Sequence, residues 1–181
     1  MILSLLLPII LNIIPISNNP VRIYAEIKKL NPNCEETFAR DLSKYLSVYS
    51  SYFGTDPIIS VAIAMQESSI SNTNRLGWVD QSGKKVRGIT DLGVFQIHYR
   101  TIRELKRTYP DLDVFRLQHD LEYQTFWHVK LLKKKITICQ SKKSSLKISS
   151  GEEWSCYHSF TLDKRKIYVK AVNVHLTKLL M

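Results

Sequence analysis

The sequence contains few glycines, cysteines and acidic residues. Six glycines and three cysteines occur among 181 residues, and 16 acidic side chains stand against 26 basic ones, a net charge of +10. Hydrophobic residues make up 44% and charged residues 23%, which excludes a disordered chain and a multispan membrane protein. The length is that of one ordinary domain with one active site.

Two kinds of catalytic motif are missing. Ser68 and Ser69 are not part of a Gly-x-Ser-x-Gly turn, which excludes a typical serine hydrolase. The histidines have no close ligand partner of zinc-site spacing; they are His98, His119, His128, His158 and His175. We therefore expect neither a metal site nor a cofactor.

The three cysteines allow at most one internal disulfide. In an oxidising compartment Cys139 and Cys156 could pair across a modest loop, which leaves Cys34 free. The alternative is that all three are reduced residues of the core.

The first residues form an apolar leader. Residues 2–16 are almost entirely Ile, Leu and Pro, and this run is shorter than the roughly 20 residues that cross a bilayer. A signal peptide ending near Ala25 fits best, which divides the chain into a leader, 1–25, and a domain, 26–181. No basic residue precedes the apolar run, so an uncleaved membrane anchor and a core helix remain alternatives. Either of the first two interpretations predicts an exported protein of the periplasm or cell envelope.

Lysines cluster between Lys130 and Lys147, where seven occur without an Asp or Glu. The run lacks interleaved aromatic residues and no nucleic-acid motif accompanies it, so we expect no nucleic-acid partner. A solvated basic face is the simplest interpretation. An anionic wall or membrane surface would be its natural ligand in an exported protein.

Helical periodicity begins after the leader. Apolar residues recur at steps of three and four over 38–53, and Gly54 ends this predicted helix. Asp56 and Pro57 are a capping side chain and a helix-starting residue. The run from Pro57 to Met65 is apolar on every side, which predicts a buried helix.

A glycine-rich stretch follows that buried helix, and two short segments in it, 78–80 and 85–87, predict a small hairpin. Helical patterns return at about 99–108, 118–136 and 162–180. The predicted fold class is mostly α (α+β), a helical domain with a small β-hairpin after the buried helix.

Glu67 stands at the carboxyl end of the buried helix. Burial and the negative end of the helix dipole both disfavour its carboxylate, which predicts a raised pKa. A carboxylic acid that stays protonated near neutral pH can act as a general acid. The simpler alternative is a solvated residue at a helix end.

Further motifs in the same order complete a pattern that resembles the lysozyme-like lytic transglycosylases, above all the small members associated with secretion systems and phage. The resemblance covers roughly residues 36–175, and the motifs are Tyr52 to Pro57, Glu67-Ser68, Gly93-x-x-Gln96-Ile97, Tyr157 and Arg165-x-x-Tyr168. It implies a lysozyme-like fold, peptidoglycan glycan strands as substrate, and secretion-system components as candidate partners.

The resemblance also implies roles for single residues. Glu67 would be the catalytic acid and base, and Ser68 would shape the neighbouring subsite. Gln96 would line the glycan groove, with the backbone of Gly93 close to the sugar because glycine permits that approach. Tyr157 would lie near the catalytic glutamate.

Three residues depart from the family pattern. Cys156 replaces an alanine, His158 replaces an asparagine that contacts substrate, and His98 stands where an asparagine often follows Gln-Ile. His158 remains a candidate substrate-binding residue. These departures also motivate a rival interpretation, a non-catalytic domain that only binds peptidoglycan.

Asp91 leaves the chemistry open. The segment Thr90-Asp91-x-Gly93-x-x-Gln96 also resembles that of animal-type lysozymes with a second carboxylate. A retaining hydrolase uses two carboxyl groups roughly 5–5.5 Å apart. We favour the transglycosylase reaction, in which a substrate hydroxyl replaces the external nucleophile, with Asp91 in the substrate groove or as a turn residue that bonds local amides.

Overall fold

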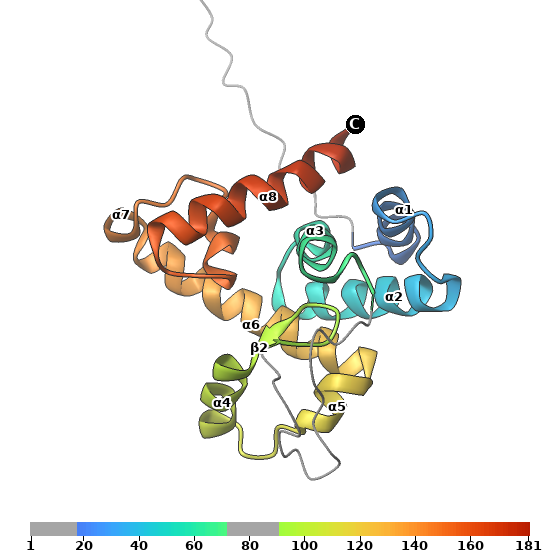
Figure 1. Cartoon of the computed structure of the whole chain (residues 1–181), viewed down its shortest axis with the longest axis horizontal. Helices are drawn as coiled ribbons and strands as arrows, with labels where there is room; N and C mark the ends of the chain where they lie inside the picture. Colours follow the sequence, from blue (N-terminus) through green and yellow to red (C-terminus); the bar gives the residue numbers. More distant parts are fainter. Residues whose placement is uncertain (1–17, 72–90) are drawn as a thin grey trace, which may run out of the picture.

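The computed structural model describes residues 18–71 and 91–181. These residues form a mostly helical domain with one two-stranded antiparallel sheet (Figure 1), which confirms the predicted fold class. None of the helices in the described ranges combines the length and apolar character needed to cross a membrane. The elements are α1 Pro20–Leu30, α2 Glu36–Phe53, α3 Pro57–Ser68, β1 Asp91–Leu92, β2 Ile97–His98, α4 Tyr99–Thr108, α5 Val114–His119, α6 Leu121–Ser141, α7 Lys143–Leu146, the 3-10 helix η1 Glu153–Tyr157 and α8 Leu162–Leu180.

Helix α1 is a part of the domain that the sequence analysis assigned largely to the leader. The Asn19 side chain accepts a hydrogen bond from the backbone of Val21 at 2.9 Å and so caps the helix. Ile23 and Ile27, one turn apart, are fully buried, and the helix contacts α2, α3 and α8. The helix continues through Ala25, so residues 20–25 belong to the packed domain.

Helices α2 and α3 follow the predicted pattern. Gly54 ends α2 in the left-handed conformation, with φ 63°, which glycine adopts at little cost. The carboxylate of Asp56 accepts a hydrogen bond from the backbone of Ile58 at 2.8 Å and caps α3. Residues 61–64 are fully buried, and α3 lies among α1, α2 and α8 (Figure 1). The predicted buried helix is confirmed, with Ile58, Ile59 and Met65 partly exposed.

The two strands form a short hairpin beside the end of α3. Asp91 pairs with His98, and Leu92 pairs with Ile97. The hairpin that the sequence predicted at 78–87 lies outside the described residues.

The helix predicted at 118–136 is α6, Leu121–Ser141, and the predicted start lies three residues early, within the end of α5. Asp120 has extended backbone angles, φ −101° and ψ 106°, which interrupt the helix after His119. Its carboxylate accepts a hydrogen bond from the backbone of Tyr123 at 3.0 Å and starts α6. A helix-capping residue thus divides a segment whose hydrophobic pattern is continuous.

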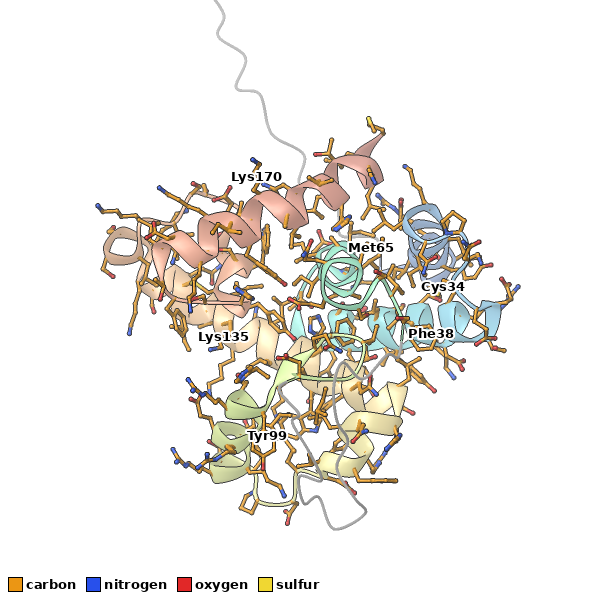
Figure 2. All side chains as sticks on the ribbon, in the orientation of Figure 1. Cys34, Phe38, Met65, Tyr99, Lys135 and Lys170 are labelled. Atoms are coloured by element: carbon orange, nitrogen blue, oxygen red, sulfur yellow. A yellow bond between two sulfur atoms is a disulfide. The ribbon has the colours of Figure 1, made fainter. Side chains whose placement is uncertain are left out.

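A disulfide joins Cys139 of α6 to Cys156 of η1, with their Cα atoms 6.3 Å apart. It ties the segment that contains Tyr157 to the end of α6. Cys34 is buried and free, and Figure 2 shows it on the side of the molecule formed by α1 and α2.

Candidate active site

A cavity of about 360 Å³ opens beside the carboxyl end of α3. Five of the seven predicted site residues line it, from three separate parts of the chain: Glu67, Asp91, Gln96, Tyr157 and His158. The other described lining residues are Ile97, His98, Thr101 and Leu131. Tertiary packing therefore collects the predicted polar side chains around one space.

Glu67 lines this cavity from the last turn of α3, and α8 supplies a hydrogen-bond partner for it. The hydroxyl of Tyr168 donates to Oε1 of Glu67 at 2.8 Å. Tyr168 is only 5% exposed, and its pKa is raised by burial first and then by the negative charge of Glu67. The buried hydroxyl therefore stays protonated and fixes one carboxylate oxygen.

Ser68 does not line the cavity in the described structure. Its side chain is buried, and its Oγ lies 2.7 Å from the carbonyl of Val94 and 3.1 Å from that of Ala64. Ser68 thus ties the end of α3 to the turn between the two strands. It supports the site from behind Glu67.

Gly93 also lies behind the cavity. Its φ is 70°, and a Cβ atom at this position would come within 2.5 Å of Oε1 of Gln124. That same oxygen accepts a hydrogen bond from the backbone of Val94 at 3.1 Å. Both the backbone conformation and the close packing of Gln124 therefore require glycine at residue 93.

Gln96 lies in the turn between β1 and β2 and forms hydrogen bonds within that turn. It has φ 45°, an uncommon conformation for a residue with a side chain. Its Nε2 donates to the carbonyl of Gly93 at 2.6 Å, and its backbone N–H donates to the same carbonyl at 3.1 Å. Strained backbone of this kind gathers at functional sites, and here it presents Gln96 to the cavity.

His128, at the base of the site, is a residue that the sequence analysis did not select. Its Nδ1 lies 3.0 Å from the hydroxyl of Tyr157 and its Nε2 lies 3.1 Å from Oγ of Ser60. The ring stacks on Phe95 with 3.6 Å between centroids, and Tyr157 also donates to the carbonyl of Phe95 at 3.3 Å. Complete burial lowers the pKa of His128 to about 3, so the imidazole is neutral. Its neighbours one turn further along α6, Leu131 and Leu132, were the available sequence signal of burial.

The carboxylates of the site influence the pKa values of both Tyr157 and His158. Burial, and then the charges of Glu67 and Asp91, raise the pKa of Tyr157. The ring of His158 stacks on Tyr168 with 4.4 Å between centroids. Partial burial, assisted by Lys164, lowers the pKa of His158, and Asp91 opposes that shift.

Within the described ranges, no three His, Cys, Asp or Glu side chains are grouped closely enough to hold a metal ion. The described side chains that line the cavity provide carboxyl groups, hydroxyls and imidazoles. Compared with protein-family models, curated proteins and solved structures, the chain matches none of them.

Proposed function

We propose that this protein is a lytic transglycosylase that cleaves the β-1,4 bond between N-acetylmuramic acid and N-acetylglucosamine in peptidoglycan and leaves 1,6-anhydro-muramoyl ends. The observation that carries the proposal is the position of Glu67, at the end of a buried helix and on the wall of a cavity shared with Gln96 and Tyr157. Such a carboxyl group, with polar side chains around it, suits a site that binds and cleaves a glycan.

Glu67 acts twice in the proposed reaction. As a carboxylic acid it protonates the glycosidic oxygen, and the bond from that oxygen to the muramoyl C1 breaks. The resulting carboxylate then removes the proton from the C6 hydroxyl of the same muramoyl residue, whose oxygen bonds to C1. The carboxylic acid is regenerated, and no water is consumed. Because Tyr168 holds Oε1 at 2.8 Å, the carboxyl group keeps one orientation through both steps.

Hydrolysis is the second candidate, and one observation favours it. Asp91 lines the same cavity as Glu67. A second carboxylate can attack or stabilise the sugar cation of a retaining muramidase. We favour transglycosylation because Glu67 alone supports it, and the products distinguish the two reactions.

The deciding experiment is digestion of purified sacculi followed by mass spectrometry of the released muropeptides. Anhydro products, one water lighter than hydrolysed ones, are expected from the wild type. Glu67→Gln keeps the shape of the side chain but has no proton to deliver, and a positioned general acid contributes about 10²–10⁴-fold in rate. Glu104→Gln, which removes an exposed carboxylate of α4, is the control.

Two outcomes would contradict the proposal. More than about a tenth of wild-type activity in Glu67→Gln would remove Glu67 from the mechanism. Binding of sacculi by the wild type without any product would instead favour the non-catalytic peptidoglycan-binding domain.

The proposed substrate requires a location outside the cytoplasm, in the periplasm or cell envelope. The Cys139–Cys156 disulfide supports that location, because disulfides persist in oxidising compartments. The apolar run at residues 2–16 would act as a signal peptide or membrane anchor. Secretion-system components as partners follow from the sequence resemblance alone.

A further inference from the structure

The lysine run of residues 130–147 does not form one basic face in the structure. The ammonium group of Lys130 lies 3.9 Å from the ring centroid of Tyr109, and that of Lys135 lies 4.5 Å from Phe160. Lys143 forms an ion pair with Glu153 at 3.1 Å. These three lysines thus have partners within the domain. The last lysine of the run, Lys147, instead lines a cavity together with other cationic residues.

That cavity, of about 330 Å³, lies between the segment after α7 and the side of α8, away from Glu67. Four cationic residues line it. Among the residues that the structure describes, Glu152 supplies the one carboxylate on its wall. The cationic residues are Lys147, Arg165, Lys166 and Lys170. The lining therefore carries a formal excess of positive charge.

Arg165 places a buried charge at this cavity. It is 3% exposed, and its guanidinium donates to the carbonyl of Phe160 at 3.1 Å and to the carbonyl of Leu146. No carboxylate pairs with it in the part of the chain that the structure describes. Backbone carbonyls satisfy its donors but supply no counter-charge, and a buried unpaired charge is costly. An anion in the cavity would offset that cost.

The lysines around Arg165 add to the local positive potential. Lys166 and Lys170 are one turn apart on α8, where like charges repel. In Figure 2 Lys170 projects outward from α8. Lys147 has φ 52°, a left-handed conformation that costs a residue with a Cβ atom. The domain thus holds three lysines together beside Arg165 without an ion pair to any of them among residues 18–71 and 91–181.

We propose that this cavity binds the phosphate group of a phosphate ester. A phosphate concentrates negative charge on several acceptor oxygens, which matches ammonium donors that approach from the two sides of the cavity. Ser149 and Asn173 also line the space and can donate further hydrogen bonds. Leu162 and Val169 provide apolar wall for the organic part of the ester. The proposal stands independently of glycan cleavage.

Titration of the full chain with inorganic phosphate and with glycerol 3-phosphate, followed by calorimetry, tests this site. Saturable binding is expected, and the double variant Lys166→Gln/Lys170→Gln should weaken it by at least about tenfold, since it removes two charge-assisted hydrogen bonds to the phosphate. Both lysines are exposed, so the variant should fold normally. The matched control, Lys44→Gln/Lys178→Gln, removes two charges from exposed positions outside the cavity.

A second arm identifies the source of the phosphate. Vesicles containing phosphatidylglycerol, compared with pure phosphatidylcholine vesicles, should bind the wild type in a manner that glycerol 3-phosphate competes away if the ligand is a lipid headgroup. Soluble phosphate binding without vesicle binding indicates a soluble ester or a phosphodiester polymer. Absence of saturable binding to every phosphate probe, or equal weakening in the site variant and the control, would overturn the proposal.

Discussion

The hydroxyl of Tyr168 donates a hydrogen bond to Oε1 of Glu67 across 2.8 Å, although the two residues are 101 positions apart in the chain. Helix α8 lies against α3, and this packing brings the hydroxyl to the carboxylate. The ring of Tyr168 is in turn covered by His158. The carboxyl group proposed as the catalytic acid is therefore held by a partner from the far end of the chain.

Replacing Tyr168 by Phe should shift the pH dependence of cleavage. A hydrogen bond donated to a carboxylate favours its charged form, so without the hydroxyl Glu67 should remain protonated to higher pH. The alkaline limb of kcat/KM against pH should then move upward, while the phenyl ring retains the packing with His158 and Trp154. The control is Tyr52→Phe, whose side chain is 79% exposed. An unchanged profile would mean that this hydrogen bond does not tune the acid.

Asp91→Asn should distinguish transglycosylation from hydrolysis. In the proposed reaction the C6 hydroxyl is the nucleophile, so the variant should keep substantial activity and release anhydro-muropeptides. If Asp91 were the second carboxylate of a retaining muramidase, activity should fall by orders of magnitude and wild-type products should carry reducing ends. Exposed Asp111→Asn is the matched control, and product masses with initial rates are the measurement.

His128 should make the protein less stable in acid. Burial holds its pKa at about 3 in the folded state, against an ordinary value of 6.5. Between these values the unfolded chain binds a proton that the folded chain does not, so the neutral ring contributes its full stability above pH 6.5 and loses it as the pH falls towards 3.

The corresponding measurement is urea unfolding of the wild type and His128→Gln over that pH range. One proton changes the free energy of unfolding by at most about 1.4 kcal/mol per pH unit, and the variant should show a slope smaller by up to this amount. Exposed His119→Gln should keep the wild-type slope. Equal slopes in wild type and His128→Gln would show that His128 is protonated in the folded protein.

Reduction of the Cys139–Cys156 disulfide should destabilise the domain and loosen its active site. The two cysteines are 17 positions apart, and closing a loop of this size stabilises a fold by about 3 kcal/mol in the chain-entropy treatment. Because η1 contains Tyr157, cleavage activity should fall together with the free energy of unfolding on addition of reductant. The double variant Cys139→Ala/Cys156→Ala should be insensitive to reductant. If reductant still lowered the activity or stability of that variant, the loss would not come from this disulfide.

Local sequence signals were sufficient for the helix that carries the acid. Asp56, Pro57 and the uninterrupted apolar run specify the start and the burial of α3, and Gly54 specifies the end of α2. These features depend on neighbours within a few residues, so a single sequence reveals them. The same local information located Glu67 at the end of α3.

Other segments could not be predicted from residues that are close to them in the sequence. Periodicity placed the start of α6 at residue 118, within α5, because Asp120 interrupts the backbone without interrupting the hydrophobic pattern. Helix α1 was not predicted because it follows the apolar leader directly. Its residues Ile23 and Ile27 are buried because α1 packs against α2 and α3. The burial of α1 is an outcome of packing.

The sequence by itself determined α2, α3, α4, α8 and the position of Glu67, since spacing and caps act over one or two turns. The family resemblance supplied the polar residues predicted around Glu67. Only the tertiary structure decided that Tyr168 holds Glu67, that His128 supports Tyr157, and that Ser68 and Gly93 lie behind the cavity rather than on it. It also separated Lys147 from the rest of its run and placed it beside Arg165. Such contacts join residues that are far apart in the chain, and their geometry depends on how the helices pack.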